Sequence, residues 1–143
     1  MGSDDPVLRW AIDTVIPLVL LLALHLLLVG HDEPGGGFVA ALVVAGALAV
    51  DAIAHETDPR RALRRMLPPS ESLVAVGLLL VAAVALWPAL TSAPLLTASG
   101  ITIPLGWLGK LKLTTVLAFD IGVFLVVVGF AAAVLDRVRE VAR

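Results

Sequence analysis

Four long apolar runs constrain this chain more than any other feature of its sequence. They cover residues 14–30, 38–54, 73–90 and 115–135, and a helix needs about 20 mostly apolar residues to cross a bilayer. A soluble four-helix bundle would need a polar stripe along each helix, and the first and third runs have none. Apolar residues make up 59% of the 143 positions, more than a soluble domain of this size can bury. The sequence therefore predicts an all-α integral membrane protein, a single domain (residues 1–143) formed by a bundle of four transmembrane helices.

A tight turn and a longer loop connect these runs on one side of the membrane. Residues 31–37 are all that separate the first two runs, so these helices form an antiparallel pair joined by a glycine-rich outer turn. The outer loop at 91–114 contains two short stretches that alternate between apolar and polar residues, 101–103 and 110–113. The alternation fits a short β-hairpin, and a loop lying on the lipid surface fits the same residues equally well.

Positive charge is divided unequally between the two sides of the predicted bundle. Eight of the ten lysines and arginines lie in the two terminal tails and the loop at 55–72, and only Lys110 and Lys112 lie on the other side. Cytoplasmic loops are enriched in basic residues, so we expect both termini in the cytoplasm. The three tryptophans lie near predicted span ends or in the outer loop, where indole rings favour the membrane–water interface.

The residue types that are missing exclude several kinds of site. The chain has no cysteine, which excludes disulfides, iron–sulfur clusters, thiolate metal sites and cysteine nucleophiles. The net charge is −2, so no global positive field attracts nucleic acid. Ser70, Ser72 and Ser92 lie at span ends without a nearby histidine, so no nucleophile–base pair is evident. We therefore expect no enzymatic activity, no cofactor and no metal centre.

Ionisable residues inside the apolar runs are the main candidates for function, because a charge at the centre of a bilayer is costly. Asp120 lies five residues into the fourth run, about 7–8 Å from its start at 1.5 Å per residue. Three interpretations stay open: an acid that reaches the membrane surface, a structural contact with a neighbouring helix, and a role in ion or proton transport. His25 lies five residues before the end of the first run. Because its predicted depth is the same, we hypothesise that His25 and Asp120 form a pair.

Two features of the second run concern its surroundings. Asp51 lies near its inner end, with His55 one turn further on, and we interpret this acid as part of a solvated span end. Ala41, Ala45 and Ala49 recur at four-residue spacing, and such small residues let helix backbones approach closely. This pattern favours a subunit that packs against other membrane helices over a solitary transporter.

Two motifs carry a resemblance to a known family. The first is Gly-His-Asp-Glu-Pro-Gly-Gly-Gly-Phe at residues 30–38, directly after an apolar helix. The second, at residues 119–129, is Phe-Asp-Ile-Gly-Val followed by an aromatic residue and an aliphatic run to glycine. Together they closely resemble the B subunit of Mrp-type multisubunit cation/proton antiporters, the MrpB/MnhB family. The order of the motifs, the chain length and the four-span layout also match, so the resemblance covers essentially the whole chain.

The resemblance implies a subunit of a larger machine in a prokaryotic cell membrane. Mrp antiporters exchange cytoplasmic Na⁺ for external protons, driven by the proton-motive force, and are built from several different membrane subunits. A subunit of this type is expected to pack beside the larger subunits and to contribute to assembly and to a cation path. The transported ions are then Na⁺ and H⁺. Two alternatives stay open: a B-type membrane subunit of an ion-translocating hydrogenase-like complex, and a purely structural assembly subunit.

The resemblance also indicates which residues matter. Of the positions carried over from the family's motifs, only His31 and Asp120 can titrate, whereas Asp32 and Glu33 stand where the family is expected to have neutral residues more often. His31 and Asp120, together with His25, are the candidates for an ion path. The remaining motif residues are expected to be structural, shaping the turn and the helix contacts. These structural candidates are Gly30, Pro34, Gly35, Gly36, Gly37, Phe38, Phe119, Gly122 and Gly129.

Overall fold

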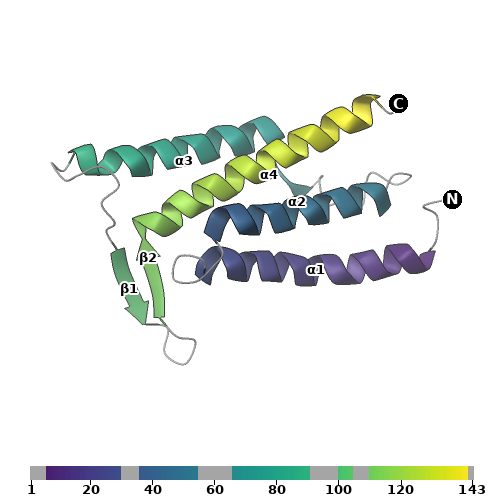
Figure 1. Ribbon diagram of the computed structural model, residues 1–143, viewed down its shortest axis with the longest axis horizontal. Helices are drawn as coiled ribbons and strands as arrows, with labels where there is room; N and C mark the ends of the chain where they lie inside the picture. The colour runs from purple at the N-terminus through teal and green to yellow at the C-terminus, as the bar shows by residue number, and fades with distance from the viewer. Residues whose placement is uncertain (1–5, 30–35, 55–65, 91–99, 105–109, 142–143) are drawn as a thin grey trace.

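Four long helices make up most of the described structure. The computed structural model describes residues 6–29, 36–54, 66–90, 100–104 and 110–141 (Figure 1). The helices are α1 (Pro6–Val29), α2 (Gly36–Ala54), α3 (Ser70–Leu90) and α4 (Thr115–Val141). All four are long and apolar enough to cross a membrane, which confirms the predicted four-helix membrane fold. Several helices extend beyond the apolar runs, α1 and α4 by the most, because a helix continues into flanking polar residues when no proline or glycine ends it.

The helices lie side by side in the order α1–α2–α4–α3 (Figure 1). Helix α2 contacts α1 on one side and α4 on the other, and α3 packs mainly on α4. Gly37 near the start of α2 meets Asp120 near the start of α4, so these two helices run in the same direction. The helix order is therefore not the chain order, because α4 inserts between α2 and α3.

The chain between α3 and α4 contains a short antiparallel hairpin. Strand β1 (Gly100–Pro104) pairs with β2 (Lys110–Thr114), and Thr102 lies opposite Lys112 at its centre. Strand β2 ends where α4 begins, and the hairpin runs across the ends of the helices (Figure 1). Of the two interpretations of the outer loop, the structure therefore has the hairpin. We call this end of the molecule the hairpin end, and the opposite end, where α1 begins and α4 finishes, the termini end.

Small residues form much of the buried core, and α2 contributes the largest share. Ala40, Ala41 and Ala132 are completely buried, and Leu48 is the largest side chain that is almost fully buried. Small side chains let α2 and α4 approach closely, which is the usual basis of helix association in lipid. Many large apolar side chains point away from the protein, especially on α1. Lipid is as apolar as leucine, so this exposure carries no hydrophobic cost in a membrane.

Candidate functional site: the seam between α2 and α4

The two sequence motifs meet in space at the hairpin end. A β-carbon built on Gly37 would overlap the carbonyl oxygen, the carbonyl carbon and the α-carbon of Asp120. Only a residue without a side chain permits this approach of α2 to α4. The glycine run of the first motif and the Phe-Asp pair of the second are therefore parts of one site, which we call the α2–α4 seam.

The backbone at the start of α2 also requires glycine. Gly36, the first residue of the helix, has a φ angle of 87°, in the left-handed region that residues with a β-carbon rarely adopt. Both Gly36 and Gly37 are buried. Two of the predicted structural glycines thus have separate reasons for being glycine: one for its backbone angle and one for its contact.

The two glycines of the second motif hold α3 against α4. A β-carbon on Gly77 of α3 would lie 2.6 Å from the carbonyl oxygen of Gly122, and one on Gly122 would lie 3.0 Å from the carbonyl oxygen of Gly77. Seven residues further along α4, a β-carbon on Gly129 would lie 2.9 Å from the β-carbon of Leu73. The glycine face of the second motif is therefore a helix-packing surface, and sequence analysis missed its partner glycine, Gly77.

Asp120 stands at the edge of this packed seam. Its main chain packs against Gly37, and the residue as a whole is half-buried. Within the described part of the chain, its carboxylate makes no hydrogen bond and no ion pair. An acid five residues inside a helix that is apolar enough to span a membrane is costly without a counter-charge.

The predicted pair of His25 and Asp120 is wrong. His25 is exposed and lies two residues from Ala23, which is 2% exposed. Two residues are about 200° of helical rotation, so His25 points away from the core contact that Ala23 makes. In addition, α2 lies between α1 and most of α4. The predicted depth places both residues toward the same end of their helices, but they face different directions.

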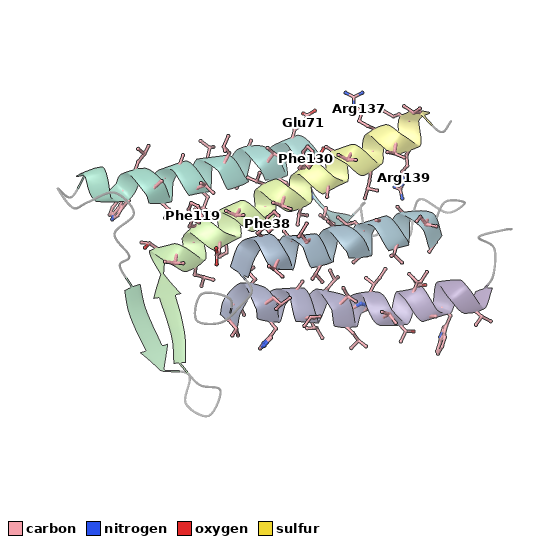
Figure 2. All side chains as sticks on the ribbon, in the orientation of Figure 1. Phe38, Glu71, Phe119, Phe130, Arg137 and Arg139 are labelled. Carbon is pink, nitrogen blue, oxygen red and sulfur yellow. The ribbon has the colours of Figure 1, made fainter. Side chains whose placement is uncertain are left out.

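Several further predicted residues can be placed. Phe38 and Phe119 lie at the starts of the neighbouring helices α2 and α4 (Figure 2), and Phe38 is 55% exposed beside the seam. Four of the candidate site residues lie outside the described residues. They are Gly30, His31, Pro34 and Gly35.

The interpretation of Asp51 as part of a solvated span end is also wrong. Asp51 is only 3% exposed, and it takes part in a polar interaction. Its position on α2 follows the same buried face as Val44 and Leu48, at spacings of three and four residues. The signal was this spacing, which continues the apolar pattern of the buried face into the last turn of the helix.

Polar ligands are sparse around the seam. Among the described residues, no group of three or more His, Cys, Asp or Glu side chains is placed to hold a metal ion. Two open pockets of about 360 and 370 Å³ border α2, and apolar side chains line both. Neither Asp120 nor Asp51 lines them. The described part of this chain therefore offers one ionisable group at the seam, Asp120, and these pockets form no polar channel beside it.

A family model settles which proteins the chain resembles. The model described as a domain related to the MnhB subunit of the Na⁺/H⁺ antiporter matches residues 7–133. The chain belongs to the MnhB family. It is 34% identical over 139 residues to the B subunit of the Na⁺/H⁺ antiporter of Bacillus subtilis, covering 96% of this chain and 95% of that protein. It is 30% identical over 141 residues to the corresponding antiporter protein of Alkalihalophilus pseudofirmus, covering 98% and 96% of the two chains.

A solved relative shares the fold of this MnhB family member. In a structure of the Mrp complex from Dietzia sp., one chain matches with a TM-score of 0.74 and 29% identity. The match covers 96% of this chain and 15% of that chain. In that relative, the four-helix unit is thus a small part of a much longer polypeptide.

Proposed function

We propose that this chain is a small membrane subunit of a multisubunit Na⁺/H⁺ antiporter, driven by the proton-motive force. The observation that carries the proposal is the α2–α4 seam, where the two motifs that define the resemblance meet at Gly37 and Asp120. Membership of the MnhB family, over 127 matched residues (7–133), supports it. So do the names of the similar proteins, which are B subunits of Na⁺/H⁺ antiporters.

A role within a larger complex fits the shape of the molecule better than a solitary transporter does. The helices form a row in which α1 and α3 are edges. The one ionisable residue of the second motif lies on the inner helix α4, near the hairpin end, and the pockets that border α2 are apolar. An ion path through hydrocarbon needs a continuous set of polar ligands. Neighbouring subunits are therefore proposed to supply the rest of any path that includes Asp120.

We further propose that the termini end faces the cytoplasm of a bacterial cell. The excess of arginine in the tails and in the loop at 55–72 supports this orientation. Exposed tryptophans lie near opposite membrane boundaries: Trp10 near the start of α1 is 71% exposed, and Trp87 near the end of α3 is 59% exposed. The chain itself is proposed to catalyse no chemical reaction and to hold no resident cofactor, with Na⁺ and H⁺ as the transported ions.

The composition of the native complex tests this function. The chain is tagged at its C-terminus and extracted gently from native membranes, and the proteins that co-purify are identified. We expect large multi-span antiporter subunits together with several small ones. Soluble hydrogenase or iron–sulfur subunits in the eluate would instead indicate a hydrogenase-like complex, and a product containing only this chain would contradict both interpretations.

A further inference from the structure

One face of α4 is only partly covered by the described part of the chain. Two faces are occupied: Gly122 and Gly129 contact α3, and Leu117, Val128 and Ala132 are buried on the side of the core. A third set of residues shares a different quarter of the helix circumference at about 100° per residue. We call this set the free face of α4. It consists of Asp120, Val123, Phe130, Val134 and Val138. Val127 lies on the same side of the helix and is partly packed against the core.

Exposure increases along this face toward the termini end. Asp120 and Val123 are half-buried, whereas Phe130 is 66% exposed, Val134 44% and Val138 58%. Phe130 lies in the second half of α4 and is labelled in Figure 2. The face is thus an apolar stripe of several turns that carries one carboxylate near its hairpin end.

The carboxylate decides what kind of partner this stripe fits. Hydrocarbon covers valine and phenylalanine without cost, but it provides no counter-charge for an acid inside the span. Within the described residues, Asp120 has neither a hydrogen bond nor an ion pair. A transmembrane helix with a basic side chain at the depth of Asp120 would satisfy both parts of the face. Intramembrane acids are typically paired in this way and face the interior of a bundle.

We propose that the free face of α4 binds a transmembrane helix of a neighbouring subunit, and that a lysine or arginine of that helix pairs with Asp120. The proposal rests on the proposed function, because it assigns the place of this chain within the complex. The solved Mrp relative gives independent support for a protein neighbour. There, the matched unit belongs to a chain of which it covers only 15%, so further polypeptide is covalently attached to the same unit.

The geometry also explains why Gly37 is needed. Because Gly37 closes the α2–α4 seam against the main chain of Asp120, the backbone that carries the carboxylate is fixed at one depth along the free face. A charge pair between helices in lipid depends on such alignment, since a misplaced partner leaves both charges unpaired. Gly37 is therefore a positioning residue for the intersubunit pair.

Photocrosslinking within the assembled complex tests the proposed partner. The crosslinking amino acid p-benzoylphenylalanine replaces Val123 or Phe130 on the free face, and it replaces Leu79 of α3 or Leu18 of α1 as matched controls. Leu79 is 70% exposed and Leu18 63% exposed, so both are as accessible to neighbours as the free face. We expect positions 123 and 130 to crosslink to one helix of another subunit, and that helix to carry a lysine or arginine. The controls are expected not to reach this helix.

A charge exchange then tests the pair itself. Asp120→Lys should reduce Na⁺/H⁺ antiport in everted vesicles at least tenfold, and replacing the basic partner residue with Asp in the same complex should restore most of it. The inference is overturned if positions 123 and 130 crosslink only to lipid or to a second copy of this chain, or if the exchanged pair fails to restore antiport. In those cases the proposed function still stands, provided that antiporter subunits co-purify with the chain. If no antiporter subunit co-purifies with the chain, the proposed function and this inference both fail.

Discussion

Two glycines on α2, nine residues apart, have opposite surroundings. A β-carbon on Gly37 would overlap the main chain of Asp120, whereas a β-carbon on Gly46 would meet nothing within 4 Å. Gly46 lines an open apolar pocket of about 360 Å³ between α1 and α2. Close packing therefore requires glycine at position 37, at the hairpin end, whereas the space beside position 46 would accept a larger side chain.

This difference shows which helix contacts tolerate no added side-chain atoms. The α2–α4 and α3–α4 contacts bring backbone against backbone, so a single added methyl group has nowhere to go. Helix α1 contacts α2 through larger side chains with an open groove between them. The motif residues of the described part of the chain thus lie where α4 packs between α2 and α3.

The largest expected effect comes from Gly37→Ala. The added β-carbon has only main-chain atoms of Asp120 before it, and these cannot rotate away, so α2 and α4 must separate. We expect a loss of about 3 kcal/mol of stability, the upper part of the range for overpacking, with little assembled complex left in the membrane. Thermal unfolding of the purified complex, followed by size-exclusion chromatography, measures this. A complex that assembles and melts as the wild type does would refute the close approach at the seam.

A similar but smaller effect is expected for Gly77→Ala. Its β-carbon would lie 2.6 Å from the carbonyl oxygen of Gly122 and 2.8 Å from the amide nitrogen of Val126. The edge helix α3 is able to shift outward because it packs mainly on α4. We expect a loss of about 1–2 kcal/mol in the same thermal assay, and antiport that persists at reduced temperature. A loss as large as that of Gly37→Ala would show that α3 is not the more adjustable partner.

Removing the charge of Asp120 without changing its shape separates transport from packing. Asp120→Asn should lower antiport about tenfold, equivalent to about 1.4 kcal/mol, while the packing of α2 on α4 is kept, because the contact with Gly37 involves only main-chain atoms. The readout is Na⁺-dependent dissipation of ΔpH in everted vesicles. The matched control is Glu71→Gln, a change to an exposed acid at the start of α3 (Figure 2). Normal antiport by Asp120→Asn would remove the carboxylate from the ion path.

The smallest effect is expected for Gly46→Ala. Its β-carbon enters open space, and alanine is favoured over glycine in a helix interior by about 1 kcal/mol. Stability should therefore stay the same or rise by up to about 1 kcal/mol, with unchanged antiport. If this variant instead failed to assemble, the groove between α1 and α2 would have to be filled tightly by another subunit.

The sequence predicted the positions of the helices better than it predicted which way their faces point. Run length alone located the four helices, because lipid requires about 20 apolar residues per span. The motif glycines were predicted to be structural, and the close contacts of Gly37, Gly122 and Gly129 agree with this. Gly77 was missed, since a lone glycine in an apolar run carries no sign of its partner. His25 and Asp120 were placed at equal depth, yet depth leaves the rotation of a helix about its axis undetermined. That rotation depends on which helices are neighbours, and the insertion of α4 between α2 and α3 cannot be read from chain order.

Asp51 shows the same limit of sequence-based prediction, because it was predicted to be solvated and is buried. Its position near the end of an apolar run indicated solvation, but the core-facing spacing of α2 continues through this residue, and it is 3% exposed. Composition identifies where a span ends, whereas burial depends on what packs against the last turn.

Antiport by a complex that lacks only this chain tests the central claim most directly. Everted vesicles are prepared from a strain in which the gene for this chain is deleted and the other subunits remain, and Na⁺-dependent dissipation of ΔpH is recorded before and after the wild-type chain is supplied. The account predicts little antiport without the chain and full recovery with it, but no recovery with Gly37→Ala. Undiminished antiport in the deletion strain would contradict the claim that this chain is a working part of a Na⁺/H⁺ antiporter.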